Sequence, residues 1–242
     1  MKARMNGTGG CRAQISARNV ATGRSTTANH TYSIAREWAA GTDGQSLLAH
    51  PASAQFRAAL PSVPLLKTDS PLLLYRGRLF AEGKTPQANE FGPPPNCSAP
   101  SGRYGLSGSS VLYLCNSEEG VRCEVLPSSA NPTLWCQRFL FQTDALRIAD
   151  FSQLPPEGFV CQVLFEAERA KSEEGCTPTF AFSQTVATLV ASCFDGMFVP
   201  GVQGADGHLY RNLVLFRQDA VWASWLDKHS PPFQLNNKPK PA

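Results

Sequence analysis

The sequence predicts an α+β fold, in which short strands form a compact mixed or antiparallel sheet accompanied by short helices and an N-terminal extension. Short apolar runs bounded by Gly, Pro or Ser recur between residues 72 and 216, as is typical of buried strands. Residues 183–194 have the clearest helical period of the second half. Several short strands with few long helices indicate an α+β sheet core. At 242 residues and 42% hydrophobic content, the chain can form one substantial domain plus extensions.

Residues 1–30 are predicted to be a disordered basic extension. They contain five Lys or Arg residues and no acidic residue, and they are rich in Ser, Thr, Gly and Asn. A stretch of this composition cannot bury a core. It also suits an organellar transit peptide, although a poorly ordered tail or another translation start, for example at Met5, is the simpler interpretation.

A short helical region, residues 31–70, is predicted to precede the main domain and to pack on it. Apolar spacing indicates helices at residues 32–40 and 52–60. Three prolines after the second helix break the helical pattern and lead into an extended segment. The main domain is therefore predicted to occupy residues 71–230, followed by a loose tail of residues 231–242.

The main domain is predicted to begin with a strand, an insertion and a second strand. Residues 72–76 are an apolar run that ends in an arginine. Residues 81–101 form a turn-rich insertion without apolar periodicity, and we expect it to form a flap over a site. A glycine-rich turn at residues 102–108 then leads into a buried strand at residues 111–115.

A helix is expected directly after this second strand. Ser117 is the expected N-cap, and Glu118 and Glu119 complement the macrodipole in the first turn. Glu124 then lies about two turns into the helix.

The second half is predicted to be mainly strands with one long helix. Ser183 is expected to cap the helix over residues 183–194, which Gly196 follows. A turn at Asp206-Gly207 is typical of a hairpin, and Asp219 is expected to cap a last short helix. The expected strands are residues 138–141 and 145–148 around a turn, 160–165, 197–199 and 209–216.

Composition excludes several classes of function. A net charge of +3 and a pI near 8.4 are too mild for a nucleic-acid surface, and no basic stripe with interleaved aromatics occurs. No apolar run is long enough to cross a membrane. The eight cysteines show no CxxC or Cys/His metal spacing, and we expect buried reduced thiols and a cytoplasmic protein without a metal site.

Six short pieces of sequence follow one another between residues 72 and 216. They are Leu74-Tyr75-Arg76, Gly102-Arg103 with Val111-Leu112-Tyr113-Leu114, Glu124, Ser183-Gln184, Asp195-Gly196 with Val199-Pro200, and Arg211-Asn212-Leu213-Val214-Leu215-Phe216. No single piece is specific, but together and in this order they resemble the RES domain family. The resemblance implies a compact fold similar to that of ADP-ribosyltransferase toxins. It also implies NAD-consuming activity, often as a toxin that a separate antitoxin protein neutralises.

The resemblance implies roles for four side chains, with NAD as substrate and no prosthetic group. Arg76 and Arg103 would clamp the pyrophosphate, because guanidinium groups form bidentate hydrogen bonds with phosphate. Tyr113 would stack on the nicotinamide or shape its pocket. Glu124 would orient the nicotinamide ribose and stabilise the positive charge that develops at the anomeric carbon, so Glu124 and Arg76 are the catalytic candidates.

The same side chains also have ordinary structural interpretations. Each arginine is otherwise a solvated strand-end residue, and Tyr113 is otherwise a core aromatic. Glu124 is otherwise an exposed helix acid paired with Arg122.

Three further residues complete the predicted site. Tyr75 lies beside Arg76 and is a weaker substrate-binding candidate, and Asn212 offers an amide from within a strand. Gly201 marks the main departure from the family, many of whose members have a serine hydroxyl at this turn. Either backbone amides and a neighbour such as Gln203 or Ser183 replace the contact of that hydroxyl with the substrate, or the protein handles the substrate differently.

The expected function is therefore cleavage of the nicotinamide–ribose bond of NAD. The acceptor is left open: water makes the protein a glycohydrolase, phosphate a phosphorylase, and a protein side chain an ADP-ribosyltransferase. The alternative is a catalytically degenerate nucleotide-binding or protein-interaction module, in which Gly201 marks the lost activity.

Overall fold

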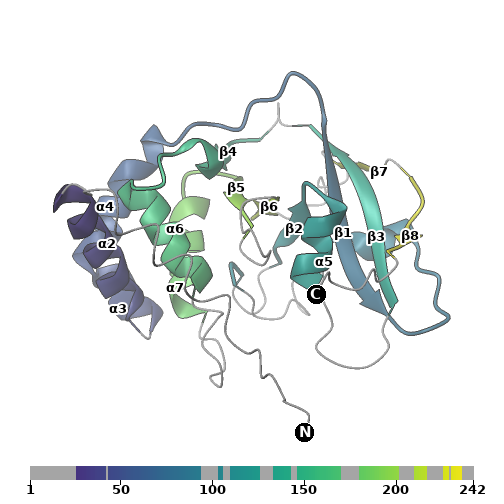
Figure 1. The fold of residues 1–242 in the computed structure, drawn as a ribbon, viewed down its shortest axis with the longest axis horizontal. Helices are drawn as coiled ribbons and strands as arrows, with labels where there is room; N and C mark the ends of the chain where they lie inside the picture. Colours follow the sequence, from purple (N-terminus) through teal and green to yellow (C-terminus); the bar gives the residue numbers. More distant parts are fainter. Residues whose placement is uncertain are drawn as a thin grey trace, which may run out of the picture.

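The computed structural model shows an α+β protein with one mixed sheet and several helices (Figure 1). Most of the helices gather at one end of the sheet, and the long strands β1 and β3 lie at the other end. The structure describes residues 26–41, 43–93, 103–105, 110–125, 133–142, 146–169, 180–201, 210–216, 226–228 and 230–235.

The strands of the sheet follow the order β4-β5-β6-β2-β1-β3-β7, and β8 pairs separately with β3. Every neighbouring pair is antiparallel except β4 with β5, which is parallel. The strands are β1 Leu72–Phe80, β2 Leu112–Cys115, β3 Thr133–Phe141, β4 Ile148–Asp150, β5 Gly196–Pro200, β6 Arg211–Leu215, β7 Leu226–Lys228 and β8 Phe233–Gln234.

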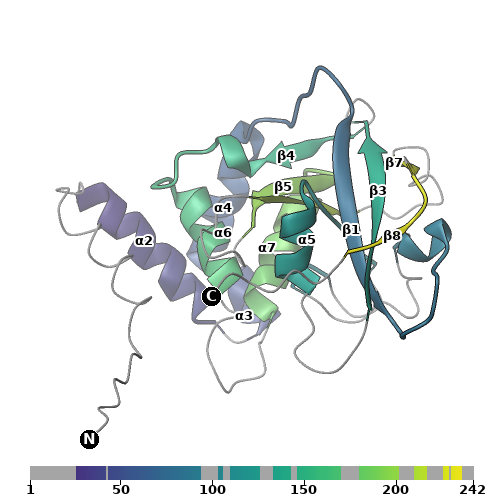
Figure 2. The same cartoon turned by 45° about the vertical axis from the view of Figure 1, so that its right-hand side comes forward.

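The helices form two groups of different size. The larger group packs together beside β4 and β5, whereas α5 lies by itself against β1 and β2 (Figure 2). The α-helices are α2 Thr26–Ala39, α3 Gly44–Ala49, α4 Pro51–Ala59, α5 Glu118–Val125, α6 Phe159–Arg169 and α7 Ala181–Ala191. Short 3-10 helices are η1 Leu60–Ser62, η2 Ala88–Phe91 and η4 Phe151–Gln153.

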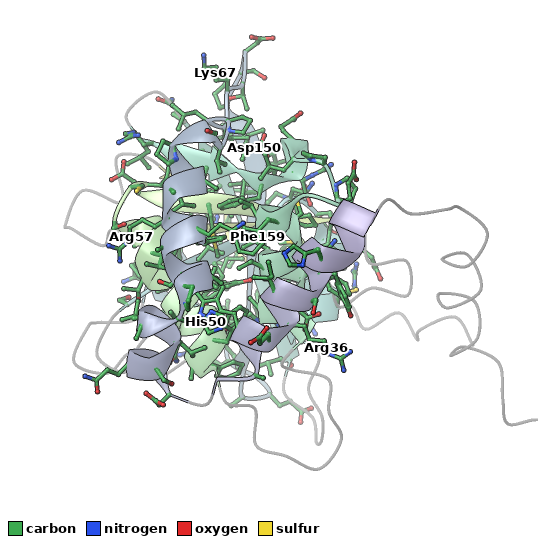
Figure 3. The ribbon with its side chains drawn as sticks, turned by 90° about the vertical axis from the view of Figure 1, so that its left-hand side faces the viewer. Arg36, His50, Arg57, Lys67, Asp150 and Phe159 are labelled. Carbon is green, nitrogen blue, oxygen red and sulfur yellow. The ribbon has the colours of Figure 1, made fainter. Side chains whose placement is uncertain are left out.

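The N-terminal helices share a hydrophobic core with the main domain. The indole nitrogen of Trp38 donates to the carbonyl of Leu47 at 2.8 Å, and its ring meets that of Phe182 edge-on at 5.0 Å. Figure 3 views this layer from outside, where Arg36 and Arg57 extend away from it. Since α2, α3 and α4 bury their apolar faces against α6 and α7, they are part of the same body.

Several predicted elements agree with the structure. Strands β1, β2, β5 and β6 and helices α4, α5 and α7 lie at or near the expected positions, although β1 continues to Phe80. Helix α2 is also present, but it begins at Thr26, within the stretch that was predicted to be disordered. The N-cap of α5 is as predicted, because the Ser117 hydroxyl accepts the backbone N–H of Gly120 at 3.0 Å.

The strand expected at residues 160–165 is wrong, because this stretch belongs to helix α6. Val163, Leu164 and Ala167 are buried, whereas Phe165 is 54% exposed. Burial at intervals of three and four residues is the helical pattern, and the six-residue apolar run was too short to show it.

Three smaller corrections concern ends and connections. Ser183 does not cap α7: it lies inside the helix, and its hydroxyl donates to the Phe180 carbonyl at 3.1 Å. Strands β3 and β4 do not pair with each other, since β3 lies between β1 and β7 and β4 lies at the far edge. The expected loose tail includes β8, whose Phe233 pairs with Cys136.

Other predictions fall outside the described residues. These are the state of residues 1–25, residues 94–101 of the expected flap, residues 102 and 106–108 of the glycine-rich turn, the hairpin turn at Asp206-Gly207 and the helix expected after Asp219. Among the residues that are described, no helix has both the length and the apolar character needed to span a membrane.

Candidate functional site

A pocket opens in the middle of the sheet, where strands β1 and β2 separate. In the described part of the chain these strands pair only at Tyr75 and Cys115. Beyond that pair the strands diverge, and Arg76 of β1 and Tyr113 of β2 line a pocket of about 320 Å³ between them. Helix α5 closes one side of this pocket through Val121 and Glu124. Six of the seven predicted site residues line it: Tyr75, Arg76, Arg103, Tyr113, Glu124 and Asn212.

Arg76 contributes a buried cation to this pocket. Its Nη1 is buried and makes no hydrogen bond with any described residue. Burial, reinforced by the nearby charge of Arg78, lowers the pKa of the Arg76 guanidinium to about 9. A buried cation without a fixed partner is costly, and an anionic ligand would offset that cost.

Arg103 lies on a short segment that is held from two sides. The backbone N–H of Tyr104 donates to the hydroxyl of Tyr113 at 2.9 Å, and Gln184 of α7 donates through its side-chain amide to the Gly105 carbonyl at 3.2 Å. Burial lowers the pKa of Arg103, and the nearby carboxylate of Glu124 opposes this effect. The segment thus places a second cation close to the carboxylate.

Glu124 is held by two donors from the other side of the pocket. The hydroxyl of Tyr210 and the Nδ2 amide of Asn212 both donate to Oε1 of Glu124, each at 2.9 Å. The ordinary pairing with Arg122 does not occur, because Arg122 meets Glu119 at 3.4 Å. Glu124 is therefore held by Asn212 of β6 and by Tyr210, the residue that directly precedes this strand.

Tyr113 contacts Tyr104 through both its ring and its hydroxyl. The ring stacks on that of Tyr104, with centroids 6.2 Å apart and an angle of 25° between the planes. Burial raises the pKa of Tyr113, so the hydroxyl stays protonated. The hydroxyl accepts the Tyr104 N–H, which gives Tyr113 a role in holding the Arg103 segment.

Gly201 is the one predicted site residue that does not line the pocket. It follows β5, and its N–H donates to the Tyr210 carbonyl at 2.9 Å. A Cβ at this position would overlap the ring of Tyr210. Glycine here makes room for a neighbouring aromatic ring, and it is not a direct contact to the pocket.

Sequence reasoning missed Tyr210 and Gln184. Gln184 was noted only as part of the opening of a helix, and its amide reaches the Arg103 segment. Tyr210 stands opposite Gly201 when the β5–β6 register is continued past Pro200 and Arg211. A glycine facing an aromatic residue across a predicted hairpin was the signal that could have identified it.

The described residues contain no group of three His, Cys, Asp or Glu side chains that could hold a metal ion. The chain matches no protein-family model, and no curated protein is significantly similar to it in sequence. The pocket itself presents two cations, one fixed carboxylate and aromatic rings.

Proposed function

We propose that this protein is an NAD-consuming enzyme of the RES type, which cleaves the bond between nicotinamide and ribose. The observation that carries the proposal is the convergence of Arg76, Arg103, Tyr113 and Glu124 on one pocket. These residues come from β1, the 103–105 segment, β2 and α5, which are separate in the sequence. They are also the residues to which the family resemblance gives roles, and the same resemblance implies a fold of the ADP-ribosyltransferase toxin type.

The two arginines suit the pyrophosphate of NAD. A dianionic ligand can accept hydrogen bonds from Nη1 of Arg76, which no described residue uses, and from the guanidinium of Arg103. The pocket volume of 320 Å³ lies near the lower end of the range for small-molecule sites, about 300–1,000 Å³. Tyr113 and Phe180 give the same pocket apolar surface for the nicotinamide ring.

Glu124 supplies the chemistry at the sugar. Breaking the glycosidic C–N bond leaves positive charge on the anomeric carbon and its ring oxygen, and a fixed carboxylate stabilises that charge more in the transition state than in the substrate. Nicotinamide leaves with the electron pair of the bond. The acceptor that then attacks the anomeric carbon is water, phosphate or a protein side chain.

The test is nicotinamide release from NAD by the purified full-length chain, with and without phosphate. We expect Glu124→Ala to lower kcat/KM by about 100-fold or more, and Arg76→Ala to weaken NAD binding as well. Glu37→Ala and Arg57→Ala, both on exposed positions of the N-terminal helices, are the matched controls. Phosphate dependence and analysis of the ribosyl product identify the acceptor.

Each negative result has a distinct meaning. Binding of NAD without nicotinamide release would contradict the enzyme and favour the degenerate binding module. Neither binding nor release would contradict the NAD proposal altogether. A toxin role is tested separately, by expressing the parent and Glu124→Ala in growing cells, where only the parent is expected to arrest growth.

A further inference from the structure

The two hydrogen bonds to Glu124 are unevenly distributed over its carboxylate. Tyr210 and Asn212 both donate to Oε1, each at 2.9 Å. Within the described residues, no hydrogen bond reaches Oε2. The two carboxylate oxygens thus differ in function, because Oε1 is occupied by fixed donors and Oε2 remains available to a ligand in the pocket.

The position of Tyr210 depends on two glycines from different elements. The ring is buried, with 2% of the residue exposed. A Cβ on Gly201 would overlap the ring, and a Cβ on Gly120 of α5 would lie 2.7 Å from its Cδ2 and Cγ atoms. Both separations are shorter than real Cβ contacts, so any side chain at either position displaces the ring.

We infer that Tyr210 is a positioning residue for Glu124, and that Gly120 and Gly201 form the slot that admits its ring. Tyr210 and Asn212 fix the rotamer of the carboxylate through Oε1, so that Oε2 faces the nicotinamide ribose. A charge-assisted hydrogen bond of this kind costs no reorganisation when charge develops at the sugar. The inference rests on the proposed function.

Steady-state nicotinamide release by Tyr210→Phe tests the inference, because this change removes only the hydroxyl. Loss of one hydrogen bond to a charged group is expected to lower kcat by roughly 10- to 100-fold. KM for NAD is expected to stay within about twofold of the parent, since the arginines that bind the phosphates are unchanged. Tyr32→Phe, on α2 and away from the pocket lining, is the matched control and is expected to keep the parental kcat.

Gly201→Ala provides a second test that keeps the hydroxyl and displaces the ring. It is expected to lower kcat to a similar degree, and combining it with Tyr210→Phe is expected to add little, because both changes remove the same contact. Thermal melting of each variant shows whether it is folded at the assay temperature. Because an unfolded fraction lowers apparent kcat without changing KM, kcat is calculated from the folded fraction that the melting curve gives at the assay temperature.

The outcomes separate the inference from the proposed function. An inactive parent overturns both of them. An active parent with parental kcat in either Tyr210→Phe or Gly201→Ala overturns the inference and leaves the enzyme proposal intact. A selective fall in kcat in both variants supports the inference.

Discussion

Arg76 has an unfavourable local environment in the isolated protein. Its guanidinium is buried between diverging strands, Nη1 makes no hydrogen bond within the described residues, and Arg78 is its nearest source of repulsion. Arg78 itself donates to the Gly92 carbonyl at 2.8 Å, so it is satisfied elsewhere. Such an uncompensated charge is retained at a cost in stability, as is common at binding sites.

We therefore predict that Arg76→Met makes the protein more stable while removing ligand binding. Replacing an unpaired buried charge by an apolar side chain of similar length is expected to raise the free energy of unfolding by about 1 kcal/mol or more. Urea unfolding measures this change. NAD is expected to raise the melting temperature of the parent and not that of the variant.

Arg57→Met is the matched control for this experiment. Arg57 is exposed near the end of α4, so its replacement is expected to change the free energy of unfolding by less than about 0.5 kcal/mol. A less stable Arg76→Met would show that the guanidinium is compensated in the folded protein, contrary to our interpretation.

At the scale of single elements, α5 brings the carboxylate of Glu124 to the site. It is only eight residues long, and its close approach to the sheet depends on Gly77 of β1 and Gly120. A Cβ on Gly77 would overlap Val121, and a Cβ on Gly120 would overlap the sulfur of Cys115. The helix thus fits against the sheet so closely that it places Glu124 in the pocket with little freedom to shift.

We predict that Gly120→Ala destabilises the protein, although the same change usually favours a helix. Alanine in a helix interior is ordinarily better than glycine by about 0.5–1 kcal/mol. Here overpacking against Cys115 and Tyr210 is expected to cost about 1–3 kcal/mol, measured by urea unfolding. Gly44→Ala at the start of α3 is the control, since its Cβ would meet only Thr185 Oγ1, at 3.9 Å. Equal stability of Gly120→Ala and the parent would contradict this account of α5.

The elements that the sequence predicted correctly are those whose ends are marked by local signals, such as a capping residue or an acidic first turn, in addition to a pattern of buried residues. In α5, the Ser117 cap and the acidic first turn mark the start of the helix without help from the rest of the chain. In α6, the run Val160 to Phe165 has no such local marker. Packing against α2 determines its conformation, and contacts between segments so distant in sequence are not visible in a short window.

The sequence also predicted part of the candidate site, but not all of it. Resemblance, and not periodicity, singled out Arg76, Arg103 and Glu124, and these three residues line one pocket. Tyr210 was missed because its role depends on a contact with Glu124, 86 residues earlier in the chain. Only the strand order, which brings β6 beside β2 and α5, creates that contact.

At the scale of the whole molecule, two buried thiols affect the stability of the fold. The five cysteines in the described ranges are free, and Cys115 and Cys136 are buried beside α5. Burial raises the pKa of the Cys115 thiol from an ordinary value of 9.0 to about 11 and that of Cys136 to about 12. The folded protein therefore holds two protons that the unfolded chain releases at lower pH.

This difference predicts a loss of stability at alkaline pH. Between pH 9 and 11 the unfolded chain binds fewer protons than the folded protein, so the free energy of unfolding falls as the pH rises. The loss is expected to reach about 1.4 kcal/mol for each thiol at pH 10. Urea unfolding of the parent and of Cys115→Ala/Cys136→Ala from pH 7 to 10 measures it. The difference in free energy of unfolding between the parent and the variant should be constant up to pH 8 and change above it. A difference that stays constant up to pH 10 would contradict the prediction.

The overlap between position 201 and the ring of Tyr210 also constrains how this protein can change by single mutations. A serine at position 201 is incompatible with the present ring position, so an ancestor or descendant with that serine must first have a smaller or displaced residue at position 210. Substitutions at positions 201 and 210 are therefore coupled, because residue 210 has to change before a side chain fits at position 201 without displacing the ring. A change at either position therefore alters the packing of the ring that holds the Tyr210 hydroxyl on the carboxylate of Glu124.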